Sequence, residues 1–198
     1  MFGKQLQRCR LIHLEELKEV QDVLILGDGN GRFSTQLLLN HASARITSLD
    51  ASKAFLAQAR KRRLKAGLPE DRIQSLEQNI LDWEFPAGRF DAVVAQFFFD
   101  SFDLDQLEAI AASISTCLRP KGKLLVSEFH IPKDTRMGNW RARVTLKFLY
   151  LLFGLLTGLK TRKLVTYTPI LERGGFRLNK AIYRSQKTLV SQVFQKSD

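Results

Sequence analysis

Residues 22–33 decide the fold, and they read Asp-Val-Leu-Ile-Leu-Gly-Asp-Gly-Asn-Gly-Arg-Phe. A short apolar run is followed by three alternating glycines and then by a segment with helical apolar spacing. Glycines let a backbone turn sharply and approach a ligand closely. The helix start behind them offers unpaired N–H groups and a positive dipole end. The stretch therefore predicts a strand, a turn and a helix that together bind an anionic group.

The spacing of the glycines narrows the choice of ligand. Gly27 and Gly29 match the first two positions of the dinucleotide fingerprint G-x-G-x-x-G, but the third position falls on Arg32. Asp50 follows the next predicted strand, where an acidic group can accept both hydroxyls of a ribose or can cap the next helix. An NAD(P)-dependent oxidoreductase is one alternative that the turn and Asp50 allow. A short-chain reductase would carry a Tyr-x-x-x-Lys pair after the fourth strand, but this spacing occurs only at Tyr183 and Lys187, beyond the predicted sheet core.

Strand and helix patterns alternate outward from this turn. Near-continuous apolar strands with helical crossovers predict a parallel sheet covered on both faces. The predicted strands are 22–26, 45–49, 72–77, 90–96 and 123–129, with helices at 32–41, 52–66 and 104–118. A long helix at 140–160, a short one at 169–173 and a hairpin of strands 176–184 and 188–195 follow. We predict one domain, 1–198, with a helical, lid-like insertion at about 133–174.

Composition limits the class of protein. Apolar residues make up 44% and charged residues 26%, as in folded globular chains. Cys9 and Cys117 alone build no disulfide framework and fit no zinc spacing, so we predict a cytoplasmic protein without a metal site. The longest apolar run, 148–159, would span about 18 Å as a helix, less than the roughly 30 Å of a hydrocarbon core.

The net charge of +11 leaves several partners open. Nucleic acid, an anionic membrane surface and an acidic substrate would all suit it. The densest basic run, 60–65, is interpreted as the solvated face of a helix, so it gives no strong nucleic-acid signal. A basic, nucleic-acid-associated protein remains the second alternative.

Five segments in order resemble the class I S-adenosylmethionine-dependent methyltransferases. They are 23–31, 48–50, 79–80, 90–96 and 118–126, the last with Lys121 in place of a family glycine. The resemblance implies a Rossmann-like α/β fold. It has a seven-stranded, mainly parallel sheet of order 3-2-1-4-5-7-6, helices on both faces and a C-terminal antiparallel hairpin. It also implies S-adenosyl-L-methionine as cofactor.

The resemblance also implies roles for residues in the cofactor site. The turn formed by Gly27, Asp28, Gly29 and Gly31 would meet the methionine carboxylate, and Asp50 would hold the ribose hydroxyls. Around the adenine, Asn79 would contact the exocyclic amine through its amide, while Ala51 and Ile80 would flank the ring faces. Gln96 would lie near the methionine end.

The acceptor is expected to be a small, apolar molecule. We predict a pocket lined by Phe97, Phe98, Phe99, His130 and Trp140, under the apolar helix 140–160 acting as a lid. His130, directly after the fifth strand, is the candidate general base, ahead of Asp100 and Asp103. The basic flanks of that helix would suit peripheral contact with an anionic membrane. The sequence leaves an oligomer open.

Overall fold

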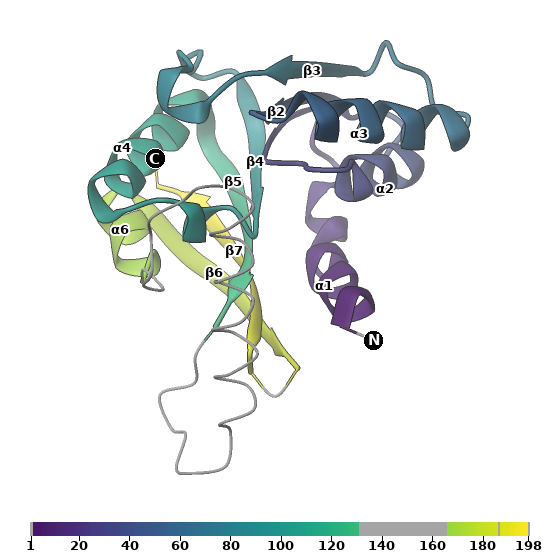
Figure 1. Cartoon of the computed structure of the whole chain (residues 1–198). Coiled ribbons are helices and arrows are strands. Elements are labelled where there is room, and N and C mark those ends of the chain that lie inside the picture. Colours follow the sequence, from purple (N-terminus) through teal and green to yellow (C-terminus); the bar gives the residue numbers. More distant parts are fainter. Residues whose placement is uncertain (1, 131–165, 186, 198) are drawn as a thin grey trace.

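The computed structural model describes residues 2–130, 166–185 and 187–197, and Figure 1 shows the arrangement of their elements. Seven strands form a single sheet in the order β3-β2-β1-β4-β5-β7-β6. This order confirms the Rossmann-like class and the C-terminal antiparallel hairpin.

Parallel pairing joins the first five strands. The strands are β1 (Asp22–Leu26), β2 (Arg45–Asp50), β3 (Ile73–Glu77), β4 (Phe90–Gln96), β5 (Leu118–Phe129), β6 (Phe176–Arg184) and β7 (Leu189–Lys196). Strand β7 inserts antiparallel between β5 and β6. The carboxyl ends of β1, β2, β4 and β5 therefore meet at one edge of the sheet, where open α/β folds bind their ligands.

Helices cover both faces of the sheet (Figure 1). Helices α1 (Phe2–Leu11), α2 (Arg32–Asn40) and α3 (Lys53–Lys65) lie on one side, while α4 (Leu104–Cys117) and α6 (Thr168–Arg173) lie on the other. Short 3-10 turns complete the described chain: η1 (Leu14–Leu17), η2 (Ile80–Asp82) and η3 (Phe99–Ser101). Two hydrophobic clusters follow this division, one beneath α4 and α6 and the other beneath η1 and α2.

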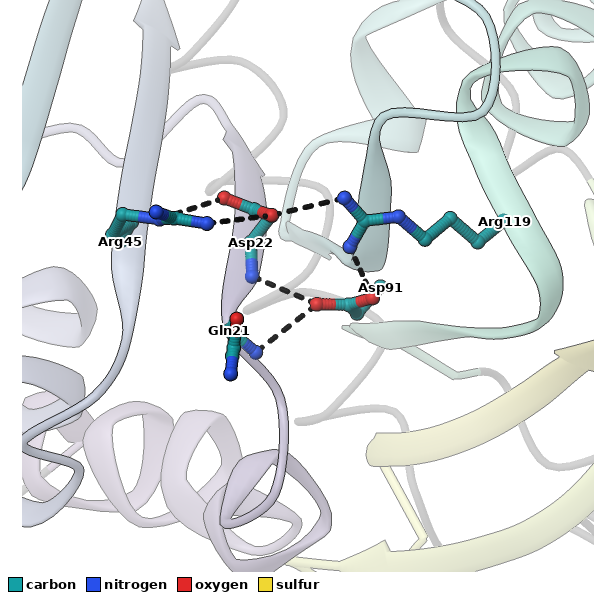
Figure 2. A network of polar contacts seen from close by, with 5 residues as sticks. All are labelled: Gln21, Asp22, Arg45, Asp91 and Arg119. Atoms are coloured by element: carbon teal, nitrogen blue, oxygen red, sulfur yellow. Dashed lines mark hydrogen bonds and ion pairs between the residues drawn. The ribbon is translucent and has the colours of Figure 1, made fainter.

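The amino-terminal edge of the sheet is closed by a charged network (Figure 2). Asp22 accepts hydrogen bonds from Arg45 Nε at 3.1 Å and from Arg119 Nη2 at 3.0 Å. Asp91 accepts the backbone N–H groups of Gln21 and Asp22 at 3.1 and 2.9 Å, and also pairs with Arg119. The network ties together the starts of β1, β2, β4 and β5.

Two features of the fold differ from the expectations. Strand β5 begins at Leu118 rather than residue 123, because Leu118 pairs with Phe90 before the register shifts toward Ala92 and Lys123. Lys121 takes a left-handed φ of 61° within this irregular start. Helix α1 and turn η1 were not predicted, since the first eleven residues carry few apolar side chains in a helical pattern. The expected helix 140–160 lies outside the described residues.

The basic run 60–65 is not simply a solvated face. Arg63 is only 1% exposed, and its guanidinium pairs with Glu70 at 3.1 Å and donates to Ser75 Oγ at 3.3 Å. Arg62 donates to the carbonyl of Asn30 in the glycine turn at 2.9 Å. The interpretation was wrong for Arg63, which is buried, whereas Arg62 is exposed as expected and also fastens α3 to the glycine turn.

Within the described ranges, no helix is long and apolar enough to cross a membrane. The same part of the chain holds no group of acidic, histidine or cysteine side chains that would bind a metal ion, and both cysteines are buried free thiols.

Candidate active site

The glycine turn between β1 and α2 has the left-handed backbone that its sequence requires. Gly27, Gly29 and Gly31 have φ values of 65°, 59° and 73°. A Cβ on Gly31 would lie 2.6 Å from the Cβ of Ala59, so this glycine lets α3 approach the turn. A Cβ on Gly29 would meet nothing within 4 Å. The turn is therefore packed closely against α3 at Gly31, and it has open space beside Gly29.

Asp50 stands directly beside this turn. Its Oδ2 accepts the N–H of Gly29 at 2.8 Å, and its Oδ1 accepts the N–H of Ser52 at 2.9 Å. The carboxylate therefore ties the glycine turn to the residues just before α3, whose N-cap is Ser52. Each oxygen keeps a second lone pair, so the group can still accept two hydroxyl hydrogens. The ribose role stays a prediction.

Asp28 carries an unsatisfied atom in the same turn. Its Oδ1 accepts the N–H of Ser34 at 3.3 Å, whereas its buried Oδ2 has no hydrogen-bond partner in the part of the chain that the structure describes. Burial raises the pKa of this carboxyl, against the opposing effects of the Ser34 hydrogen bonds and of Arg63. A buried acceptor left unpaired costs free energy unless a ligand satisfies it.

The three residues expected around the adenine lie in different surroundings. Asn79 caps η2, with its Oδ1 accepting from Leu81 N at 3.2 Å and its Nδ2 donating to Asp82 at 3.0 Å. Ile80 is a core residue, and Ala51 is exposed at the end of β2. Asn79 keeps one N–H and one lone pair for a ligand, and Asp82 adds an acidic group that the sequence interpretation missed.

The end of β4 lies next to the glycine turn and carries several of the residues predicted for the site. Gln96 is buried and donates from Nε2 to the carbonyl of Arg10 at 2.8 Å, so its amide is directed toward α1. Phe97 follows with a left-handed φ of 53°, which is strained for a residue other than glycine. The ring of Phe98 then lies against Gly27, where a Cβ on the glycine would be 2.5 Å from Phe98 Cδ2.

The aromatic residues after β4 fall into two groups. Some rings are partly exposed and form what we call the aromatic wall, and others are buried in the core. Phe97 and Phe98 are partly exposed, with Phe97 packed on Phe129 and Phe98 packed on Phe102, both at 5.0 Å between ring centroids. Phe99, expected to line the pocket, is only 2% exposed and belongs to the core with Phe102. Phe99 supports the wall from behind.

Glu128 is the buried acidic residue that the sequence interpretation missed. It is 1% exposed in β5, and its Oε1 accepts the N–H groups of Phe98 and Phe99, both at 2.8 Å. Its Oε2 is buried and has no partner among residues 2–130, 166–185 and 187–197. Burial, followed by the nearby Asp100, raises the pKa of Glu128 well above its ordinary value. The available signal was a lone acidic residue within an otherwise apolar strand end.

His130, the predicted base, lies at the end of β5. Its ring contacts the ring of Tyr183 at 5.0 Å between centroids, and its backbone N–H donates to the carbonyl of Thr188 at 2.9 Å. Burial and the nearby Lys187 lower its pKa, which keeps the imidazole neutral and able to accept a proton at pH 7. Its catalytic role stays a prediction, and Trp140 lies outside the described residues.

The site fits a nucleoside-linked amino acid better than a dinucleotide. The turn offers one open glycine and the start of a single helix, and Asp50 stands where ribose hydroxyls can be accepted. The unpartnered Asp28 Oδ2 suits a hydrogen-bond donor, such as an amino group, better than a phosphate. These are properties of an S-adenosylmethionine site.

Comparison with known proteins agrees with this assignment. Residues 23–122 match the family model described as a methyltransferase domain. The chain is 30% identical over 158 residues to a demethylmenaquinone methyltransferase from Thermus thermophilus, which covers 79% of this chain and 70% of that protein. It is also 34% identical over 87 residues to the ribosomal RNA small subunit methyltransferase H of Nostoc punctiforme, covering 44% of this chain and 27% of that protein.

Solved structures share the fold. The S-adenosylmethionine-dependent methyltransferase SibL in its apo form superposes with a TM-score of 0.76 at 22% identity, covering 99% of this chain and 56% of that chain. The N-methyltransferase NodS from Bradyrhizobium japonicum superposes with a TM-score of 0.69 at 17% identity over the whole of both chains. The protein belongs to the methyltransferase-domain family, as a class I enzyme whose cofactor is S-adenosylmethionine.

Proposed function

We propose that the protein transfers the methyl group to a small, largely apolar acceptor with an aromatic ring. The contact between Phe98 and Gly27 carries this proposal, because it puts an aromatic wall directly beside the cofactor turn. Phe97 and Phe98 present partly exposed rings backed by Phe102 and Phe129. Aromatic walls with few polar groups are typical of sites for apolar small molecules.

The relatives suggest a class of acceptor. The Thermus thermophilus protein is named for demethylmenaquinone, a lipophilic quinone. A quinol of that type would offer a flat ring to Phe97 and Phe98. Its hydrophobic tail would require a membrane or a carrier, in keeping with the net charge of +11 and peripheral contact with an anionic lipid surface.

This reaction requires little chemistry from the side chains of the protein. S-adenosylmethionine supplies an electrophilic methyl group, so the protein mainly orients the acceptor and excludes water. If the acceptor atom carries a proton, His130 in its neutral form can receive it, and Asp100 is the rival. The turn that carries Phe98 and Phe99 is held by Glu128, which keeps the wall in register with Gly27.

The test is a transfer assay with a labelled methyl donor. Short-chain demethylmenaquinol, simple phenols, RNA and protein are offered with and without anionic vesicles. We expect transfer to the quinol or phenol, and a rise in acceptor KM of about tenfold in Phe98→Ala, the size expected for losing a buried aromatic contact. Leu104→Ala, at an exposed leucine of α4, is the matched control. Transfer to RNA or protein alone would overturn the proposal.

A further inference from the structure

The connection between β3 and β4 differs from the other parallel crossovers of the sheet. Helices α2, α3 and α4 connect β1 to β2, β2 to β3 and β4 to β5, whereas residues 78–89 hold only the short turn η2. A crossover helix normally covers the face of the sheet beside its strands. Among the described residues, the face of β2 and β3 on the α4 side therefore lacks a helix of its own (Figure 1).

This face of β2 and β3 changes from apolar to polar along the strands. Leu49 pairs in register with Leu76, and both leucines pack into the core cluster that contains Ile80. Two positions earlier on the same face, Thr47 pairs with Gln74. A surface that packs against an apolar segment would be apolar along its whole length. The polar half is therefore suited to water or to a polar ligand.

A cavity of about 510 Å³ lies beside this polar half of the face. Thr47 and Gln74 line it together with four arginines, each of which stands at or next to the start of a parallel strand. These arginines are Arg45, Arg72, Arg89 and Arg119. The volume is within the range of roughly 300–1,000 Å³ that is typical of sites for small molecules.

Two of the arginines are held in place by the network at the amino-terminal edge. Arg45 and Arg119 both donate to Asp22, and Figure 2 shows their guanidinium groups on opposite sides of its carboxylate. Their side chains nevertheless stay 65% and 42% exposed. A guanidinium has five N–H donors, so each of these groups keeps donors that a ligand can reach.

Arg89 differs from the other three arginines. Its guanidinium lies 5.8 Å from the centroid of the Phe90 ring, and within the described residues it makes no hydrogen bond or ion pair. The side chain is exposed, so its charge is available to a ligand. Arg72, by contrast, donates to backbone carbonyls at the end of α2 and has a structural role.

The charges around the cavity favour an anion. Asp22 and Asp71 are the acidic residues of its lining, and Asp91 pairs with one of the lining arginines. The four guanidinium groups therefore outnumber the carboxylates even when Asp91 is included. Guanidinium groups that reach a ligand from different strands suit a phosphate, whose oxygens project in several directions, better than a planar carboxylate.

We propose that this cavity binds a small, soluble organic phosphate. Arg45, Arg89 and Arg119 hold the phosphate group, and Thr47 and Gln74 hydrogen-bond to the polar body of the molecule. The site lies at the starts of the parallel strands, at the opposite edge of the sheet from the glycine turn. It is therefore separate from the cofactor and acceptor sites, and the inference does not depend on the identity of the acceptor.

The experiment follows ribose 5-phosphate by ³¹P nuclear magnetic resonance, with the full chain saturated with S-adenosylhomocysteine. The cofactor product contains no phosphorus, so the signal reports only the phosphate ligand. We expect saturable binding, which Arg89→Gln weakens about tenfold or more, as for loss of hydrogen bonds to a charged group. Arg177→Gln removes the same charge from an exposed position on β6, and its affinity should stay within about twofold of the wild type.

A second variant tests the polar face directly. Gln74→Glu adds a carboxylate to the lining at an exposed position, and we expect it to weaken ribose 5-phosphate about tenfold as well. Unchanged affinity in either cavity variant, or an equal loss in Arg177→Gln, would overturn the proposal. It would also be overturned if S-adenosylhomocysteine displaced the phosphate, or if the protein bound vesicles containing phosphatidic acid but not ribose 5-phosphate.

Discussion

The two edges of the sheet treat their charges in opposite ways. At the amino-terminal edge, Asp22, Asp91 and Arg119 satisfy one another and the neighbouring backbone (Figure 2). At the carboxyl edge, Asp28 and Glu128 each keep one buried oxygen without a partner among the described residues. Buried unpaired acceptors reduce stability unless a ligand satisfies them, so both carboxyl groups are candidates for ligand contacts; Gln7, His41 and Arg63 also keep one such buried atom in this part of the chain. The amino-terminal edge is closed by its own ion pairs, whereas the carboxyl edge is where we expect the cofactor and the acceptor to bind.

The largest expected effect distinguishes a glycine that is needed for packing from a glycine that is needed for ligand binding within the same turn. Gly31→Ala should destabilise the protein by about 3 kcal/mol or more, because the new Cβ would meet Ala59 and the left-handed backbone would be strained. Gly29→Ala should cost only about 1 kcal/mol, since its Cβ meets nothing, yet it should impair S-adenosylhomocysteine binding. Urea unfolding and calorimetry measure the two quantities. Equal destabilisation by both variants would contradict this separation.

At the amino-terminal edge, Asp91→Ala should cost about 2 kcal/mol of stability and leave cofactor affinity unchanged. Burial alone would raise the pKa of Asp91, but hydrogen bonds from Asp22, Arg119 and Gln21 outweigh it and hold the pKa below its ordinary value. Its stabilisation is therefore present above the unfolded pKa and lost as pH falls through the folded one. Unfolding in urea from pH 3 to 7 tests this trend, with exposed Asp71→Ala as the control. A binding defect with unchanged stability would reverse the roles of the two edges.

Glu128→Gln should show the smallest effect on stability at pH 5 and a pH trend of the opposite sign. The pKa of Glu128 is raised, so its contribution is complete below the unfolded pKa and is lost as pH rises through the folded pKa. The glutamine variant does not titrate there, so its stability relative to the wild type should increase with pH by at most about 1.4 kcal/mol per unit. Exposed Glu84→Gln is the matched control. A relative stability of Glu128→Gln that does not change between pH 5 and 8 would show that Glu128 is already ionised in the fold.

Local patterns in the sequence were enough to predict most of the fold. The bounds of β1, β4 and β6 were predicted as observed, and Ser52 caps α3 as expected, with its Oγ accepting from Phe55 N. These features depend on neighbours in the chain. The early start of β5 escaped prediction because it depends on pairing with Phe90 across the sheet.

The candidate site was predictable only where its residues follow strand ends. The adjacency of Gly29 and Asp50 follows from two neighbouring parallel strands, and the sequence places both. The burial of Glu128 in β5 and the contact of Arg10 with Phe97 escaped prediction, because they depend on the docking of distant segments. A polar residue in an unremarkable helix gives no local sign that it will lie over Phe97.

The attachment of α1 to β7 has a consequence for protein synthesis. Cys9 and Val190 are separated by 181 positions, and His13 contacts the carbonyl of Ser191 across 178 positions. A ribosome adds roughly 5–20 residues per second, so α1 waits on the order of ten seconds for the strand on which it docks. The glycine turn and Asp50 emerge early and can fold locally with β1 and β2. Helix α1 leaves the ribosome before either of them and is anchored only after β7 has been made.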